Sequence, residues 1–203
     1  MLYKKHPLKK PFRVYLHGTV LPVYNPSILK NDFLNHHYLK TGNPRQQEAY
    51  KQLQQLKIFE NLKAYTPVLT GTIPIEIDIP ESDLDIICYC KNHQQFEKDV
   101  AAFYAKMDAF TIKTTLWNHK KSIVAKFKTH SFTLEIFGQN TPVEQQHAYK
   151  HMLIEHKILQ KMGPEFKAEI IKLKKEGLKT EPAFAKLLGL QGNPYTELLK
   201  VTI

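Results

Sequence analysis

The segment Ser82-Asp83-Leu84-Asp85-Ile86-Ile87-Cys88 is the most informative part of this sequence for the fold. Its apolar residues predict a β-strand, in which successive side chains point to opposite faces of the sheet. Asp83 and Asp85 then share one face, whereas the other face carries apolar or small side chains directed into a core: Leu84, Ile86, Cys88 and Cys90. Two neighbouring carboxylates repel each other unless a cation lies between them, and Mg²⁺ prefers carboxylate oxygens. The alternative is a pair of solvent-exposed acids where the strand begins.

A third carboxylate and a glycine-containing turn extend this candidate site. The alternating segment 131–137 predicts another strand, and Glu135 completes a three-carboxylate cluster if the two strands are adjacent. Such a cluster can hold two metal ions that clamp the attacking and leaving oxygens of a phosphoryl transfer. The carboxylate nearest the acceptor hydroxyl can take its proton. Upstream, Gly71 lets the backbone approach a phosphate closely, and the Thr72 hydroxyl can donate to phosphate oxygens.

Together these elements resemble the polymerase-β-type nucleotidyltransferase superfamily. The pattern consists of Gly71-Thr72, then Asp83-Leu84-Asp85-Ile86, then Leu134-Glu135-Ile136. Longer strings resemble a small bacterial family of unknown function within that superfamily: residues 69–75, 83–88, 146–152 and 177–184. The resemblance covers about residues 31–203. The sequence departs from the superfamily pattern at two positions that bear on activity. Thr72 replaces the more usual Ser, and Glu135 replaces the more usual Asp.

The resemblance implies a Mg²⁺-dependent transfer of a nucleoside monophosphate from a nucleotide triphosphate, such as ATP, to a hydroxyl acceptor. The three acids Asp83, Asp85 and Glu135 would be both the catalytic residues and the ligands of one or two Mg²⁺ ions. The triphosphate would be held by Gly71, Thr72, Ser82 and Lys179, the last at a helix start that attracts anions. The acceptor stays open between a small molecule, an RNA and a protein. The alternative function is a non-catalytic nucleotidyltransferase-like module that binds RNA or a partner protein, as an antitoxin does.

The implied fold is an α/β (α+β) nucleotidyltransferase-like mixed sheet with flanking helices. We expect a basic N-terminal arm over residues 1–30, the α/β core over 31–142, and a C-terminal helical subdomain over 143–203 that packs on the core. Helices are expected at about 44–60, 93–108, 143–162, 164–176 and 181–188. Strands are expected at 65–69, 84–90, 111–117, 122–128 and 131–137. Lys120 and Lys121 are expected in a solvated hairpin turn.

Charge and composition narrow the function classes. The 203 residues carry a formal charge of +10, which by itself favours a nucleic-acid partner. Six of the positive charges lie in residues 1–30, however, and five carboxylates gather between Glu76 and Asp85. With 42% hydrophobic residues the chain is neither fibrous nor wholly disordered. No apolar run is long enough to cross a bilayer, no secretory h-region follows the first residues, and two cysteines form no disulfide framework, so we expect a cytoplasmic protein without a membrane partner.

A second group of polar residues lies on one expected helix. His147, His151 and Glu155 recur every fourth position and therefore share a face. Three interpretations stay open: a zinc site, contacts to the active-site cleft, or an ordinary polar helix face. Trp117, the single tryptophan, and the pair His36-His37 indicate no function by themselves.

Overall fold

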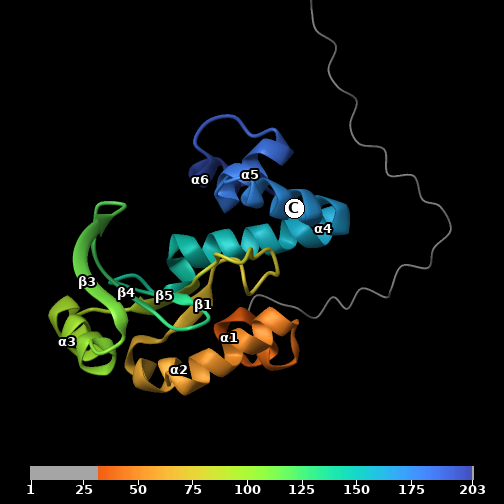
Figure 1. Ribbon diagram of the computed structural model, residues 1–203. Helices are drawn as coiled ribbons and strands as arrows, with labels where there is room; N and C mark the ends of the chain where they lie inside the picture. Colours follow the sequence, from red (N-terminus) through yellow and green to blue (C-terminus); the bar gives the residue numbers. More distant parts are fainter. Residues whose placement is uncertain (1–31, 203) are drawn as a thin grey trace, which may run out of the picture.

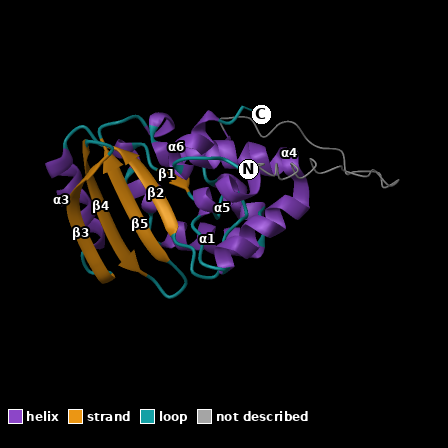
Figure 2. Ribbon diagram, turned by 90° about the horizontal axis from the view of Figure 1, so that it is seen from above, coloured by secondary structure: helices purple, strands orange, loops and turns teal. Residues whose placement is uncertain are grey.

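A computed structural model describes residues 32–202 of the chain, so the expected arm over residues 1–30 lies outside the described residues. Its centre is a five-stranded mixed sheet in the order β1-β2-β5-β4-β3 (Figure 2). The strands are β1 (Val68–Thr70), β2 (Leu84–Tyr89), β3 (Asp108–Trp117), β4 (Lys120–Lys128) and β5 (Thr133–Gln139). Strands β2 and β5 are parallel, and every other pair is antiparallel. Flanking helices complete the expected mixed α+β fold.

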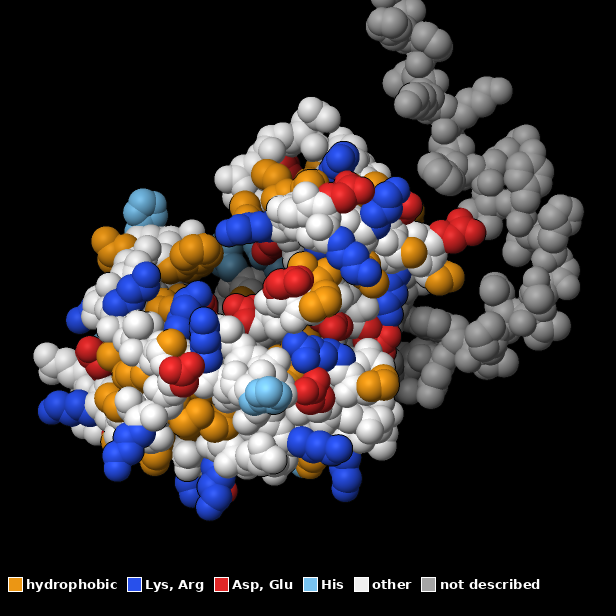
Figure 3. Space-filling view, viewed as in Figure 1, with side chains coloured by type: hydrophobic (Ala, Val, Ile, Leu, Met, Phe, Trp, Pro, Cys, Tyr) orange, Lys and Arg blue, Asp and Glu red, His pale blue; other side chains and the backbone are white. Residues whose placement is uncertain are grey.

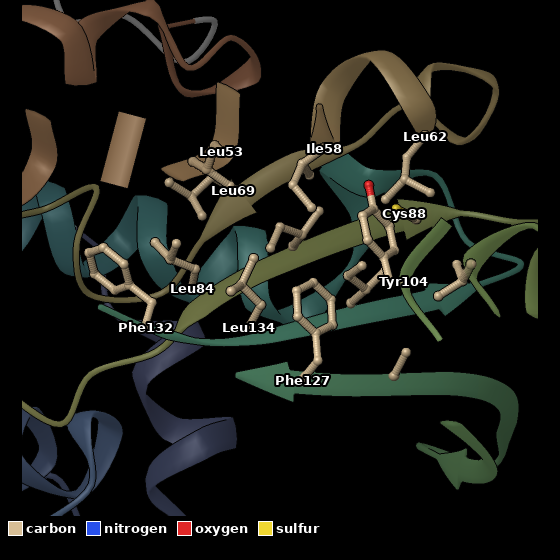
Figure 4. Packing of buried hydrophobic residues seen from close by; sticks show 14 of the residues in the cluster. Leu53, Ile58, Leu62, Leu69, Leu84, Cys88, Tyr104, Phe127, Phe132 and Leu134 are labelled. Atoms are coloured by element: carbon tan, nitrogen blue, oxygen red, sulfur yellow. The ribbon is translucent and has the colours of Figure 1, made fainter. Parts of the chain in front are cut away.

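Three helices cover one face of the sheet (Figure 1): α1 (Pro44–Gln55), α2 (Ile58–Asn61) and α3 (His93–Tyr104). The alternating apolar residues of β2 and β5, such as Leu84 and Leu134, point into this layer. There they pack against Leu53, Ile58 and Tyr104 (Figure 4). Full burial of one such side chain contributes about 1.5–3 kcal/mol, so this cluster supplies much of the driving force for folding. Cys88 and Cys90 are buried here, as expected.

The opposite face is only partly covered. Helices α4 (His147–Lys175), α5 (Thr180–Leu188) and α6 (Pro194–Glu197) lie over the β1 and β2 side of the sheet (Figure 1). Val68 and Ile87 pack there against Tyr149, Met152 and Phe184. Because this layer leaves the β5, β4 and β3 side open, a cleft remains above those strands.

Helix α4 consists of two helical segments joined at Gly163, whose backbone is non-helical (φ 83°, ψ −175°). Pro164 begins the second segment, where its missing N–H costs nothing. The sequence predicted this stop and start. Shorter 3₁₀ turns complete the chain: Asp32–Leu34, His37–Thr41, Lys63–Tyr65, Val143–Gln145 and Leu198–Lys200. None of the helices within residues 32–202 combines the length and apolarity that crossing a bilayer requires.

The expected single helix over 44–60 is wrong in one respect, because α1 and α2 are separate. The start is as predicted: the Asn43 side chain accepts from the Gln46 N–H at 2.9 Å, and Gln46 Oε1 accepts from the Asn43 N–H at 3.0 Å. This capping box precedes Pro44 as the first helical residue. The break is at Lys57, which adopts a left-handed conformation (φ 51°, ψ 37°). No glycine or proline marks that position.

The expected turn at Lys120 and Lys121 is also wrong, since both residues begin β4. The two-residue loop of the β3–β4 hairpin is Asn118-His119, with φ of 48° and 60°. Trp117 therefore pairs with Lys120. A tight hairpin loop requires positive φ at both central residues, which Asn and His adopt more readily than most other side chains. The other expected elements lie where the sequence predicted them, with ends shifted by a few residues.

Candidate functional site

The sheet brings the three acids predicted from the sequence together. Asp85 on β2 is the register partner of Glu135 on β5 and of Thr70 on β1. Partners on adjacent strands project from the same face, so the two carboxylates are neighbours. Asp83 precedes β2 by one residue and shares this face, whereas Leu84 points into the core on the other side.

This carboxylate cluster is short of positive charge. Burial, followed by the charges of Asp83 and Glu135, raises the pKa of Asp85 to about 8. Burial and the charge of Glu135 also raise the pKa of Asp83. The nearest cation is Lys126 on β4, whose Nζ lies 2.5 Å from Glu135 Oε2, and this contact raises the pKa of Lys126. Placing negative charge in such a site costs free energy, and a bound cation would lower that cost.

A tight turn between β1 and the following loop lies against the cluster. Gly71 has φ +83°, and a Cβ atom at this position would lie 2.4 Å from Asp85 Oδ2. Only glycine therefore fits here, for conformational and for steric reasons. The following loop closes on itself: Thr72 Oγ1 donates to Ser82 Oγ at 3.2 Å, and Ser82 Oγ accepts from the Ile79 N–H at 3.0 Å. Thr72 and Ser82 are thus held side by side, and Asp83 follows Ser82 directly in the chain.

All of these residues line one cleft of about 1190 Å³ between the open face of the sheet and helices α4, α5 and α6. Figure 3 shows the hollow, with acidic side chains in and around it and Lys or Arg side chains on its rim. The cleft contains every residue that the sequence singled out for catalysis, metal or triphosphate: Gly71, Thr72, Ser82, Asp83, Asp85, Glu135 and Lys179. Lys179 lies immediately before α5, where the helix begins.

His147, His151 and Glu155 line the opposite wall of this cleft, which favours the second of the three interpretations of this row. His151 Nε2 lies 2.7 Å from the Tyr195 carbonyl oxygen, and His151 Nδ1 lies 3.4 Å from Glu181 Oε1. Since a carbonyl oxygen only accepts, Nε2 carries a hydrogen there. Nε2 of His151 is therefore not available as a zinc ligand.

A buried acid and a buried base connect α4 to the loop that begins at Gly71. Glu155 is 3% exposed, and burial together with the charge of Glu181 raises its pKa to about 8. Burial lowers the pKa of Lys174 to about 8, while the charge of Glu155 opposes that shift. Lys174 Nζ donates to the Ile77 carbonyl oxygen at 2.6 Å. The second segment of α4 thereby holds the loop in place beside the carboxylates.

Among residues 32–202, no group of three or more His, Cys, Asp or Glu side chains is arranged to hold a metal ion. This statement includes the carboxylate cluster, in which Glu135 contacts Lys126. The donor set nevertheless suits Mg²⁺, since all three side chains offer oxygen atoms and their mutual repulsion is only partly balanced by Lys126.

Sequence reasoning missed several charged or aromatic residues of the cleft, among them Lys126, Lys174, Glu181 and Tyr195. Strand alternation could have found Lys126, because it faces Glu135 across the β4–β5 hairpin. The other three come from helices whose docking on the sheet no local pattern encodes.

The family's sequence profile, described as "Domain of unknown function (DUF4269)", matches residues 51–201. This chain is a member of that family. The match begins within α1 and contains both the carboxylate cluster and the cleft wall. No curated protein matches this DUF4269 chain.

Several solved structures are similar to the DUF4269 domain at low sequence identity. Cid1 poly(U) polymerase with magnesium and 3′-dATP is 16% identical, with a TM-score of 0.46 over 68% of this chain and 45% of that one. A cytoplasmic RNA terminal U-transferase is 16% identical, with a TM-score of 0.45 over 71% and 45%. Cid1 with the UTP analogue UMPNPP is 18% identical, with a TM-score of 0.44 over 63% and 39%. The chain therefore spans less than half the length of these proteins.

Proposed function

We propose that this DUF4269 chain is a nucleotidyltransferase that moves a nucleoside monophosphate from a nucleotide triphosphate to a hydroxyl acceptor. One observation carries the proposal. Three carboxylates that repel one another share the floor of a large cleft, and the Gly71 turn lies so close to Asp85 that a methyl group would not fit. A structural role does not account for three half-buried carboxylates side by side, whereas phosphoryl-transfer chemistry needs them.

Asp83 and Asp85 would hold Mg²⁺, with Glu135 as the third ligand or as the base. When bound, Mg²⁺ supplies the positive charge that balances these carboxylates and the triphosphate oxygens. For Glu135 to join as a ligand, its carboxylate has to leave Lys126, and Lys126 is then available to a phosphate oxygen. Lys126 thus balances the charge of Glu135 in the place of a metal ion.

The triphosphate would lie along the Gly71 turn and the start of α5. The backbone N–H groups of the turn and the Ser82 hydroxyl are donors suited to phosphate oxygens, and the Thr72 hydroxyl joins them if it turns away from Ser82 Oγ. Lys179, at the positive end of the α5 dipole, supplies a charge on the facing wall. Thr72 keeps the hydroxyl of the more usual serine, so its additional methyl group leaves the donor in place.

The transfer balances without a further reactant. The acceptor hydroxyl oxygen bonds to the α-phosphorus, the bond from that phosphorus to the bridging oxygen breaks, and pyrophosphate leaves. The hydroxyl proton passes to a carboxylate oxygen of Glu135 once this carboxylate has left Lys126.

Isothermal titration with each of the four ribonucleotide triphosphates, with and without Mg²⁺, tests the proposal. We expect Mg²⁺-dependent binding by the wild type, and weaker, metal-independent binding by Asp83→Asn and Asp85→Asn. Asp108→Asn is the matched control, because Asp108 is an exposed acid at the start of β3 outside the cleft. Identical titrations of all four proteins would refute a metal-bridged triphosphate site.

Transfer itself is measured by incubating the protein with an α-³²P-labelled nucleotide triphosphate, Mg²⁺ and cell extract. We expect a labelled product whose formation falls about 100- to 1,000-fold in Asp85→Asn, the usual effect of removing one electrostatic contact to the transition state. Mg²⁺-dependent binding without any labelled product would leave a nucleotide-binding module and exclude the enzyme.

A further inference from the structure

One surface of the cleft is not used by the proposed chemistry. Strand β3 is the edge strand of the sheet, and three of its alternating residues line the cleft: Lys113, Thr115 and Trp117. The register partner of Trp117 is Lys120 on β4, which lines the cleft as well. Partners in an antiparallel pair have neighbouring side chains on one face, so an indole and an ammonium group lie together near the hairpin tip.

Trp117 is the only tryptophan in the chain, and it is 53% exposed. Tryptophan is highly buried on average, so a half-exposed ring at the mouth of a cleft is an informative exception. The position is also firmly held. Gln139 Nε2 donates to the Trp117 carbonyl oxygen at 3.3 Å, and Lys120 Nζ donates to Thr141 Oγ1 at 3.1 Å. The ring is therefore presented from a fixed backbone.

The cleft face of β4 leads from this tip to the carboxylates. Alternating residues of the strand run from Lys120 through Val124 to Lys126, which contacts Glu135. At roughly 3.4 Å per residue, this path is about 20 Å long. It begins with an aromatic platform and a lysine and ends with a lysine beside the proposed catalytic acids.

We propose that this surface, Trp117 with Lys113 and Lys120, binds single-stranded nucleic acid and directs its terminal hydroxyl toward the carboxylates. The inference rests on the proposed function for the identity of the acceptor, but not for the binding itself. Sequence-tolerant binding of single strands combines aromatic rings, on which bases stack, with lysines that follow the phosphates. A duplex would not expose base faces to the indole. A neutral acceptor would not use the lysines, and a polycationic acceptor would be repelled by them.

The hairpin provides its own control on the opposite face of the same strands. Leu116 is 74% exposed and pairs with Lys121, and neither residue lines the cleft. The pair Leu116 and Lys121 therefore reproduces the composition of an apolar residue beside a lysine, one residue away from Trp117 and Lys120. The control pair lies on the opposite face and lacks the aromatic ring.

The single tryptophan makes the binding directly measurable. We expect an eight-nucleotide single-stranded RNA to quench the fluorescence of Trp117. An abasic strand of equal length and a poly-glutamate peptide of equal charge should leave it largely unchanged. Quenching by poly-glutamate equal to that by RNA would overturn the proposal in favour of an acidic protein partner. Equal quenching by the abasic strand would overturn it as well, because no base would then stack.

Variants are compared by the anisotropy of a labelled strand. Trp117→Ala should weaken binding by about 5- to 150-fold, the effect of losing one stacked base, whereas Trp117→Phe retains a stacking ring and should restore most of it. Leu116→Ala should have no effect. Lys120→Ala should reduce the slope of log affinity against log salt by about 0.7, and Lys121→Ala should not. Equal losses on the two faces of the hairpin would overturn the proposal.

A final arm separates this proposal from the function on which it rests. Asp83→Asn/Asp85→Asn should bind the strand and quench Trp117 like the wild type, yet fail to extend it with labelled nucleotide. Transfer to some other acceptor without strand binding would refute the surface and leave the nucleotidyltransferase. Strand binding without any transfer by the wild type would refute the nucleotidyltransferase and the acceptor role, and leave the binding surface.

Discussion

The two faces of the β-sheet differ in chemistry, although the same strands form both of them. On β2, Leu84 and Ile86 are fully buried in the cluster beneath α1, α2 and α3, whereas Asp85 between them projects into the cleft. On β5, Leu134 and Ile136 flank Glu135 in the same way. One face therefore carries apolar packing along both strands, whereas the other combines a second apolar cluster beneath α4 and α5 with charges that oppose folding. Residues adjacent in sequence have opposite effects on the free energy of unfolding.

This division means that stability and chemistry can be changed separately. A large apolar core on one face tolerates repelling carboxylates on the other, because an electrostatic cost of a few kcal/mol is a fraction of the stabilisation from burial. We therefore expect that shortening a core side chain destabilises the protein, whereas neutralising a cleft carboxylate stabilises it.

Leu84→Ala should strongly destabilise the protein and spare the site. Leu84 is fully buried, and shortening such a side chain costs about 2–5 kcal/mol because a cavity remains. Urea denaturation at pH 7 measures the loss. In native buffer the folded fraction should still bind nucleotide and Mg²⁺ with nearly the affinity of the wild type. A large loss of affinity in fully folded protein would show that the two faces are coupled.

Gly71→Ala tests the contact between the turn and Asp85. The positive φ and the expected clash with Asp85 Oδ2 together should destabilise the protein by about 1–3 kcal/mol and abolish Mg²⁺-dependent nucleotide binding. Gly177→Ala is the matched control, since Gly177 has φ +96° and no neighbouring atom within 4 Å of an added Cβ. It should show the conformational cost alone. Equal effects of both substitutions on nucleotide binding would contradict a steric role for Asp85.

Asp85→Asn should stabilise the protein while removing its activity. Burial and neighbouring charge raise the pKa of Asp85 to about 8, so the folded protein binds this proton more tightly than the unfolded chain does. The stability of the wild type therefore falls as pH rises from about 4 toward 8, and the variant escapes this loss. We expect a gain of about 2–5 kcal/mol at pH 8, the upper value corresponding to the whole rise in the pKa of Asp85, and a Tm higher by at least roughly 4 °C.

Calorimetry at pH 5 and pH 8, without divalent cations, measures this gain. The difference in Tm between variant and wild type should be larger at pH 8. Added Mg²⁺ should raise the Tm of the wild type more than that of Asp85→Asn, because only the wild type retains the full set of carboxylates. A variant less stable than the wild type at both pH values would contradict the division between the two faces.

Glu155→Gln should have the smallest effect on the free energy of unfolding, and it tests a buried acid on the opposite wall of the cleft. Burial raises the pKa of Glu155 to about 8, so the wild type again loses stability as pH rises from about 5 to 8. The difference in unfolding free energy between variant and wild type should grow by about 1–3 kcal/mol over this range, the upper value corresponding to the whole rise in the pKa of Glu155. Denaturation at several pH values checks it. Glu165→Gln, an exposed acid on the same helix, should show no such trend.

The sequence predicted β2 and its two faces well because strand alternation is a local rule. The positions of Leu84, Asp85 and Ile86 follow from it directly, and so does the neighbourhood of Glu135 once β2 and β5 are adjacent. The helix starts were also local signals, as the capping box at Asn43 illustrates. The same rule found the buried cysteines, since Cys88 and Cys90 continue the apolar face.

What the sequence did not predict depends on distant contacts or on unusual backbone. Lys57 ends α1 in a left-handed conformation without a glycine, and the hairpin loop is formed by Asn118-His119 and not by the lysines that follow. Lys174 and Tyr195 reach the cleft only because α4 and α6 fold back over the sheet. No short pattern could report that arrangement, since it is determined by packing among several elements.

The parallel pairing of β2 with β5 also affects the stage of folding at which the site can form. The chain between Asp85 and Glu135 contains α3 and the whole β3–β4 hairpin. We expect these local elements to form before the β2–β5 ladder, because the ladder must close a long loop. The repelling carboxylates would then meet only when the two strands pair. During refolding, nucleotide binding should accordingly appear last and report complete native structure more faithfully than any measure of secondary structure.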